Sequence, residues 1–141
     1  MSKSDRFFYG KEEKLKSRKT IESLFGKGKS FSCYPIKIIW LPECNDAVLQ
    51  SAVGASSRHF KKAVERNRIK RLLRESYRLQ KNGLFTCLHN NQQVMSVFFL
   101  YVAKELPSYE LVYKKMGDAI ERLTQLSLGS AQKNNTENNP E

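Results

Sequence analysis

Apolar and charged positions alternate most regularly between Arg58 and Lys81, where they follow the period of an α-helix. No Gly or Pro interrupts this stretch, and Asn82-Gly83 is expected to end the helix. One side is apolar and consists of Ile69, Leu72, Leu73 and Tyr77. The polar residues Ser76 and Gln80 continue the same line along the helix. The other side is basic and consists of Asn67, Lys70, Arg71, Arg74, Arg78 and Lys81, with Arg66 and Arg68 at its flanks. The pattern predicts a helix that packs on a core and turns cations outward.

Weaker patterns before this stretch predict a short helix and two strands. The helix would have its N-cap at Ser17 and end at Gly26 and Gly28, with an apolar side made of Ile21, Leu24 and Phe25. Positions alternate from Phe31 to Leu41, as in a strand with Ile36, Ile38 and Trp40 on one face and Lys37, Ile39 and Leu41 on the other. Residues 47–55 are expected to form a second strand, antiparallel to the first. Ser56 and Ser57 would then either cap the basic helix or contact phosphate, and capping is the favoured role.

The segments after the basic helix predict one strand and one helix. Leu84 to Leu88 is followed by a polar loop from His89 to Gln93, and Cys87 and His89 are interpreted as lying in a weak, loop-like segment. Val94 to Val102 is almost continuously apolar, which is typical of a central strand covered on both faces. Pro107 would end this segment, and Ser108 would cap a last helix. The core positions of that helix are expected to be Val112, Met116, Ala119, Ile120 and Leu123. This order of elements predicts an α+β sandwich of one sheet with helices.

The length of 141 residues fits a single domain. We expect the domain to span residues 14–126. Residues 1–13 are interpreted as a flexible N-terminal extension, and residues 127–141, rich in Asn and Ser, as a disordered C-terminal tail.

Charge narrows the choice of partner. The formal net charge is +11, and ten of the 25 Lys and Arg residues lie between Arg58 and Lys81. Such segregation favours a binding face for nucleic acid or another polyanion. No apolar run is long enough to span a membrane, and the N-terminus lacks the apolar region of a signal peptide. The three cysteines show no CxxC spacing. Free thiols in a reducing cytoplasm are therefore expected.

Candidate catalytic groups are hard to find in the sequence. His59 lies among cations, and both His89 and Cys87 fall in the segment interpreted as a loop. No cluster of acids indicates a two-metal nuclease site, and there is no Gly-rich phosphate loop. We therefore expect no catalytic residue and no metal site in this chain alone.

Three non-catalytic classes fit a basic helix. A DNA-binding basic region would continue into a leucine zipper, whereas this helix is expected to stop at Asn82-Gly83. A membrane-surface helix would need the narrow apolar face that the sheet requires. A ribosomal or other structured-RNA-binding protein remains open as the alternative to the assignment that follows.

The basic stretch resembles the signature of the bacterial ribonuclease P protein component. The matching run is Ala63-Val64-Glu65-Arg66-Asn67-Arg68-Ile69-Lys70-Arg71-Leu72-Leu73-Arg74-Glu75, in which Arg66-Asn67-Arg68 is the most diagnostic tripeptide. Arg58-His59 replaces a Lys-Lys pair of the family, and Lys61 replaces a Gly. The resemblance extends more weakly from Lys14 to Leu126.

This resemblance implies a fold like ribosomal protein S5 domain 2, with a left-handed β-α-β crossover. It also implies a non-catalytic subunit of a cytoplasmic ribonucleoprotein endoribonuclease, which removes the 5′ leader of precursor tRNA. The partners would be the ribonuclease P RNA, which would hold the catalytic Mg²⁺, and precursor tRNA, with no obligate protein partner and no membrane. Phe25 and Ile39 match positions of the leader-binding cleft. The residues expected to bind RNA are Arg58, His59, Lys62, Arg66, Asn67, Arg68, Lys70, Arg71, Arg74 and Arg78.

Overall fold

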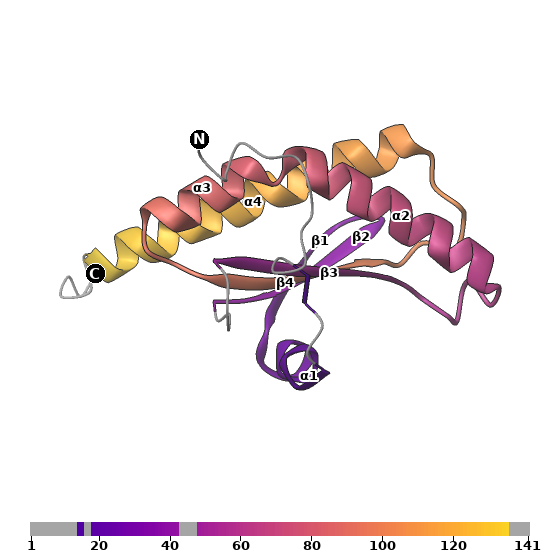
Figure 1. The fold of residues 1–141 in the computed structure, drawn as a ribbon, viewed down its shortest axis with the longest axis horizontal. Helices are drawn as coiled ribbons and strands as arrows, with labels where there is room; N and C mark the ends of the chain where they lie inside the picture. The colour runs from indigo at the N-terminus through magenta and orange to yellow at the C-terminus, as the bar shows by residue number, and fades with distance from the viewer. Residues whose placement is uncertain (1–13, 16–17, 43–47, 136–141) are drawn as a thin grey trace.

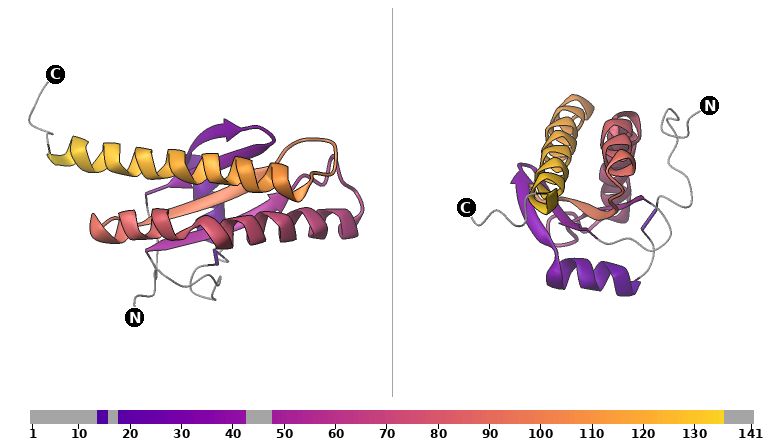
Figure 2. Two further views of the ribbon diagram at one scale, coloured as in Figure 1. Left: turned by 90° about the horizontal axis from the view of Figure 1, so that it is seen from above. Right: turned by 90° about the vertical axis from the view of Figure 1, so that its left-hand side faces the viewer.

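The computed structural model describes residues 14–15, 18–42 and 48–135, and the structural statements below concern those residues. Four strands form one sheet in the order β1-β2-β4-β3 (Figure 1). The elements are α1 (Arg18–Lys27), β1 (Lys29–Cys33), β2 (Ile36–Leu41), β3 (Leu49–Ala55), α2 (Ala63–Gln80), α3 (Asn82–Asn90), β4 (Met95–Tyr101) and α4 (Tyr109–Asn135). Figure 2 shows α4 alongside the α2–α3 pair on one face of the sheet, and α1 across the other face. The predicted α+β architecture is confirmed.

The strand pairing differs from the prediction at two places. The region 31–41 is not one strand but a hairpin, because the chain reverses at Tyr34-Pro35 and β1 pairs with β2 antiparallel. β3 does not pair with β2, because β4 lies between them; β4 is antiparallel to β2 and parallel to β3. β4 takes the central place because its side chains are apolar on both faces, as its sequence predicts. The parallel pair β3 and β4 is joined through α2 and α3, which makes a β-α-β crossover.

The sheet separates two cores of unequal size. The larger core lies between the sheet and α2, α3 and α4, and receives Ile36, Ile38 and Trp40 from β2. The smaller core lies beneath α1 and contains Leu15, Leu24, Ile39 and Leu41. The alternation predicted for β2 is therefore confirmed, and helices cover both faces of this strand, in which only Lys37 is exposed.

The basic helix starts and ends elsewhere than expected. α2 begins at Ala63, and residues 58–62 form a turn and an irregular segment before it. Asn82-Gly83 does not end the helical run, because Lys81 keeps a helical backbone and the N–H of Phe85 donates to its carbonyl oxygen (2.9 Å). The chain continues as α3, whose Leu84 and Leu88 are buried in the larger core. Burial of these two leucines outweighs the local stop signal.

The last helix is longer than predicted. Ser108 Oγ accepts a hydrogen bond from the N–H of Leu111 (3.2 Å), which confirms the N-cap. All five predicted core positions of α4 are buried. The prediction of a disordered tail is wrong for residues 127–135, which are helical; Ser127 is buried and donates to Gln93 Oε1 (2.5 Å). Residues 136–141 and the extension 1–13 lie outside the described part of the chain, as does the predicted N-cap Ser17. None of the described helices is long and apolar enough to cross a membrane.

Candidate nucleic-acid interface

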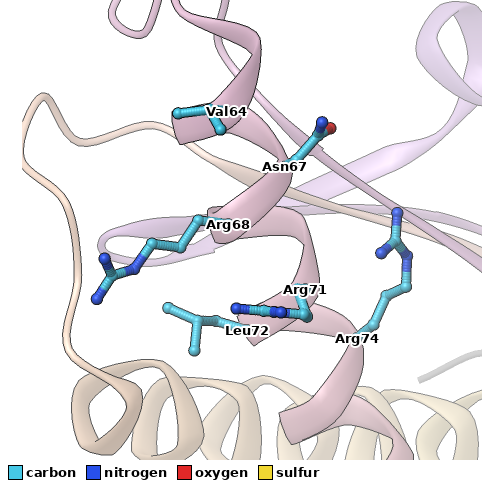
Figure 3. A pocket seen from close by; sticks show the side chains of 6 residues that line it. All are labelled: Val64, Asn67, Arg68, Arg71, Leu72 and Arg74. Carbon is cyan, nitrogen blue, oxygen red and sulfur yellow. The ribbon is translucent and has the colours of Figure 1, made fainter.

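The outer face of α2 carries a surface that we call the basic ridge. Its most exposed members are Asn67, Arg68, Arg71 and Arg74, and Lys70 and Arg78 are half-buried at its edges. The ridge encloses a shallow groove of about 670 Å³, lined by Val64, Asn67, Arg68, Arg71, Leu72 and Arg74 (Figure 3). Guanidinium groups at this spacing can make bidentate contacts to successive phosphates. Lys81, predicted on this face, is instead buried at the junction of α2 and α3.

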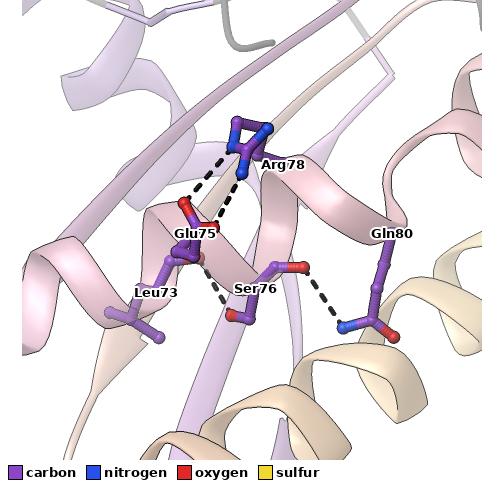
Figure 4. Close-up of polar contacts among 5 residues, drawn as sticks. All are labelled: Leu73, Glu75, Ser76, Arg78 and Gln80. Carbon is purple, nitrogen blue, oxygen red and sulfur yellow. Dashed lines mark hydrogen bonds and ion pairs between the residues drawn. The ribbon is translucent and has the colours of Figure 1, made fainter. Parts of the chain in front are cut away.

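Two arginines of α2 have partners within the protein. The Arg66 Nη1 group donates to the carbonyl oxygens of Phe60 (2.8 Å) and Lys61 (3.0 Å) and so holds the segment that enters the helix. Arg78 donates to both carboxylate oxygens of Glu75, at 3.3 and 2.7 Å (Figure 4). This hydrogen bonding lowers the pKa of Glu75 below its usual value. Arg66 and Arg78 therefore have structural roles that Arg68, Arg71 and Arg74 are not seen to share.

The predicted contacts Arg58, His59 and Lys62 precede the helix. Ser56 shapes this turn rather than capping α2, because its Oγ accepts from the N–H of Arg58 (3.2 Å) and its carbonyl oxygen from the N–H of Phe60 (3.0 Å). Phe60 is buried, with its ring centroid 6.0 Å from that of Tyr101 on β4. This anchor leaves Arg58 and Lys62 exposed and His59 half-buried at the start of the ridge.

A second surface lies on the opposite face of the sheet, beside α1. Phe25 is 51% exposed, and its ring centroid is 5.1 Å from that of Phe98 on β4. Ile39, the other predicted cleft residue, is only 6% exposed because α1 covers it. The structure therefore places Ile39 in the smaller core and leaves it little surface for a ligand.

Phe98 is the aromatic residue of this surface that the sequence reading missed. It alternates with Val97 and Phe99, which face the larger core, so its own side chain points to the α1 side. Gly54 on β3 lies against it: a Cβ at position 54 would be 2.9 Å from Phe98 Cζ. The missing side chain leaves room for the ring over β3. Alternation within β4 was the signal that could have identified Phe98, but the run was interpreted only as a buried strand.

The described residues hold no group of three or more His, Cys, Asp or Glu that could bind a metal ion. Burial raises the pKa of the Cys33 thiol above its usual value, which disfavours the reactive thiolate. His89 stacks on Phe85 in α3, with ring centroids 6.0 Å apart, and Cys87 lies on the same helix rather than in a loop. The two surfaces described above, the cationic surface on α2 and the aromatic surface beside α1, lie on opposite sides of one sheet.

These features define a class, namely a small basic α+β protein with a cationic helix on one sheet face and an aromatic surface on the other. The family model described as Ribonuclease P matches residues 9–124. The chain belongs to the ribonuclease P protein component family. It is 35% identical over 136 residues to the ribonuclease P protein component of Porphyromonas gingivalis W83, covering 95% of this chain and 99% of that protein. The protein component of Chlorobium phaeobacteroides is 32% identical over 118 residues, covering 75% and 81% of the two chains.

Solved structures show the same fold. The ribonuclease P protein of Thermotoga maritima superposes with a TM-score of 0.61 at 21% identity, covering 78% of this chain and 96% of that one. The Staphylococcus aureus protein gives a TM-score of 0.57 at 15% identity, covering 83% and 96%. The family assignment made from Arg66-Asn67-Arg68 is confirmed. As a family member, the chain is a component of an endoribonuclease of tRNA processing.

Proposed function

We propose that this chain binds the RNA subunit of ribonuclease P through the basic ridge and assists removal of the 5′ leader from precursor tRNA. The observation that carries the proposal is the exposure of Asn67, Arg68, Arg71 and Arg74 on one face of a helix whose other face is fixed in the core. A rigid row of guanidinium groups suits a folded RNA backbone, because its phosphates are also fixed in space. Arg58, His59 and Lys62 would extend the contact at the start of the helix.

The leader would bind on the other side of the sheet, at Phe25 and Phe98. Unpaired bases stack on aromatic side chains, and Phe25 is the most exposed phenylalanine of that surface. Ile39 would act only indirectly, by supporting α1 from below. This arrangement separates the two RNA ligands by the thickness of the sheet.

The cleavage reaction would be catalysed by the RNA subunit, which would also hold the Mg²⁺ that activates the attacking water. The protein residues would contribute positive charge and orientation. Cations next to the folded RNA reduce phosphate repulsion, so the Mg²⁺ concentration needed for cleavage should fall when the protein is present. Cytoplasmic localisation and the lack of an obligate protein partner belong to the same proposal.

Reconstitution tests this function. The purified chain, the ribonuclease P RNA and precursor tRNA would be combined at low Mg²⁺, with each component also assayed alone. We expect cleavage at the 5′ end of the mature sequence only when the RNA is present, and faster cleavage with protein than without. Site-specific cleavage by the protein alone would overturn the non-catalytic role. RNA binding without any effect on cleavage would favour the alternative, a structured-RNA-binding protein with no role in processing.

Salt dependence tests the ridge. The logarithm of the binding constant should fall by about 0.7–0.9 for each phosphate neutralised per unit of log salt concentration. Replacing Arg71, which is exposed, or Lys70, which is half-buried, by Ala should reduce the slope by about one contact. Identical slopes for these variants and the wild type would show that the ridge does not contact RNA.

A further inference from the structure

Two tyrosines on α4 have no part in the function proposed above. Tyr109 and Tyr113 are 37% and 39% exposed, and their ring centroids are 5.8 Å apart at an interplanar angle of 44°. Gln80 Nε2 of α2 donates to the carbonyl oxygen of Tyr113 (3.0 Å), so this pair lies beside the C-terminal part of α2. Leu106, just before α4, is also exposed. Large apolar side chains grouped at a surface indicate a binding site more often than isolated ones do.

The tyrosine pair adjoins the basic ridge. Gln80, which donates to the backbone of Tyr113, lies two residues after Arg78 on α2, so the tyrosine pair lies near the end of α2 that carries the Glu75–Arg78 ion pair. Burial raises the pKa of Tyr109, and the charge of Glu75 raises it further. Figure 3 shows Arg68 and Leu72 projecting from the same side of α2, with α4 crossing below them in that view. The negative charge of Glu75 is offset by Arg78 at 2.7 Å. Arg71 and Arg68 stand about one and two turns before Glu75 on the same helix, so the arginines of the ridge precede the tyrosine pair along α2.

This mixture of groups fits an unpaired segment of RNA. Bases stack on tyrosine rings or on the apolar side chain of Leu72, while arginines beside them bind the phosphates that link the bases. A double-stranded RNA would use the cations but not the rings. The RNA on this side would be the RNA subunit, because Phe25 belongs to α1 and Phe98 packs with the core beneath it, and α1 lies on the opposite face of the sheet (Figure 2).

We propose that Tyr109 and Tyr113 form a stacking platform for unpaired nucleotides of the RNA subunit, next to phosphates held by Arg68 and Arg71. The inference rests on the proposed function and adds a second recognition element to it. The ridge supplies salt-dependent affinity, whereas the platform supplies affinity that does not depend on counterion release.

The test compares full-length variants for binding to ribonuclease P RNA across a range of salt concentrations. The double variant Tyr109→Leu/Tyr113→Leu keeps apolar packing and removes both rings, whereas Tyr109→Phe/Tyr113→Phe keeps the rings. Tyr34→Leu, at an exposed tyrosine of the β1–β2 turn, is the matched control. We expect the Leu variant to bind about fivefold more weakly or worse, with an unchanged salt slope, because one stacked base contributes about 1–3 kcal/mol. The Phe variant and the Tyr34 control should bind like the wild type.

Ultraviolet crosslinking of the wild-type complex tests the same contact without a substitution. A nucleotide adduct on residues 109–114 is expected, and adducts confined to other segments would overturn the platform even if the Leu variant fails to fold. Unchanged RNA binding by the Leu variant would overturn the platform alone, provided that Arg71→Ala still reduces the slope. A wild-type protein that does not bind the RNA would overturn the proposed function itself. A Leu variant that loses only its preference for precursor tRNA over mature tRNA would assign the tyrosines to the leader. A Leu variant with a changed oligomeric state would assign them to a contact between copies of the chain. Either result would overturn the platform.

Discussion

The guanidinium of Arg66 donates a hydrogen bond of 2.8 Å to the carbonyl oxygen of Phe60, six residues earlier in the chain. Phe60 is buried against Tyr101 of the central strand, so this bond ties the start of α2 to the sheet. A second bond reaches the carbonyl oxygen of Lys61 (3.0 Å). The first arginine of the diagnostic tripeptide therefore positions the basic ridge, whereas Arg68 two residues later is exposed on it.

This relationship predicts different effects of two similar substitutions. Arg66→Ala should lower the free energy of unfolding by about 1–2 kcal/mol, because two hydrogen bonds from a charged donor are lost. Arg68→Ala should leave stability nearly unchanged and weaken RNA binding. Urea denaturation followed by circular dichroism measures the first effect. Equal stability of the two variants would show that the Arg66 bonds contribute nothing net.

Adjacent residues on α1 offer a second contrast. Leu24 is fully buried in the smaller core, and Leu24→Ala should cost about 2–5 kcal/mol of stability. Phe25→Ala should cost much less, because the ring is half exposed and touches Phe98 along one side. Thermal melts of both variants decide the matter. A large loss in Phe25→Ala would mean that the ring belongs to the core and is not available to RNA.

The same ring allows a functional prediction. Phe25→Ala and Phe98→Ala should weaken binding of precursor tRNA in the assembled enzyme, by about 1–3 kcal/mol for each base that loses its stacking partner. Binding of mature tRNA, which has no leader, should stay near the wild-type value. Arg68→Ala is the control, since it should impair assembly with the RNA subunit and affect both tRNAs together. Equal losses for both tRNAs in the phenylalanine variants would contradict the leader assignment.

The sequence predicted the surfaces better than the connections. The apolar and the basic face of α2 could both be predicted, because they depend only on the spacing of residues within that helix. The end of α2 could not, because Asn82-Gly83 is a stop signal that burial of Leu84 and Leu88 overrides. β1 was predicted only in part, as the start of a strand from Phe31 to Leu41, because Lys29–Cys33 is mostly polar and forms a separate strand by pairing with β2. At the site, the exposed cations were predictable, but the bonds of Arg66 and Arg78 depend on side-chain geometry. The burial of Ile39 could not be predicted, because it depends on the way α1 packs across β2, which the strand pattern does not reveal.

Two glycines near the end of α1 should respond differently to alanine. A Cβ at Gly28 would lie 2.3 Å from the carbonyl oxygen of Leu24, which also accepts the Gly28 N–H at 2.8 Å. Gly28→Ala must therefore shift the backbone between α1 and β1, and should cost about 1–3 kcal/mol. Gly26, within the helix, has open space around its added Cβ, so Gly26→Ala should be neutral or stabilise by about 0.5–1 kcal/mol. Chemical denaturation of the pair provides its own control, and a Gly28→Ala variant as stable as Gly26→Ala would show that this turn adjusts freely.

The Glu75–Arg78 ion pair should limit how strongly the basic ridge attracts RNA. Glu75 carries a negative charge on the outer side of α2 and holds Arg78 at 2.7 Å. Glu75→Gln removes that charge and releases Arg78, so binding to ribonuclease P RNA should tighten. If Arg78 then reaches one further phosphate, the salt slope should steepen by about 0.7–0.9.

The contribution of this ion pair to stability should depend on pH. The pKa of Glu75 is lowered in the folded protein, so any stabilisation by the ion pair is present above the unfolded pKa and is lost as pH falls through the folded value. Wild type and Glu75→Gln should therefore differ slightly in melting temperature at neutral pH and converge in acid.

The double variant Glu75→Gln/Arg78→Ala is the control for RNA binding, because it removes the acid without leaving Arg78 to bind RNA. A salt slope for Glu75→Gln no steeper than that of this double variant would show that the released Arg78 does not reach RNA.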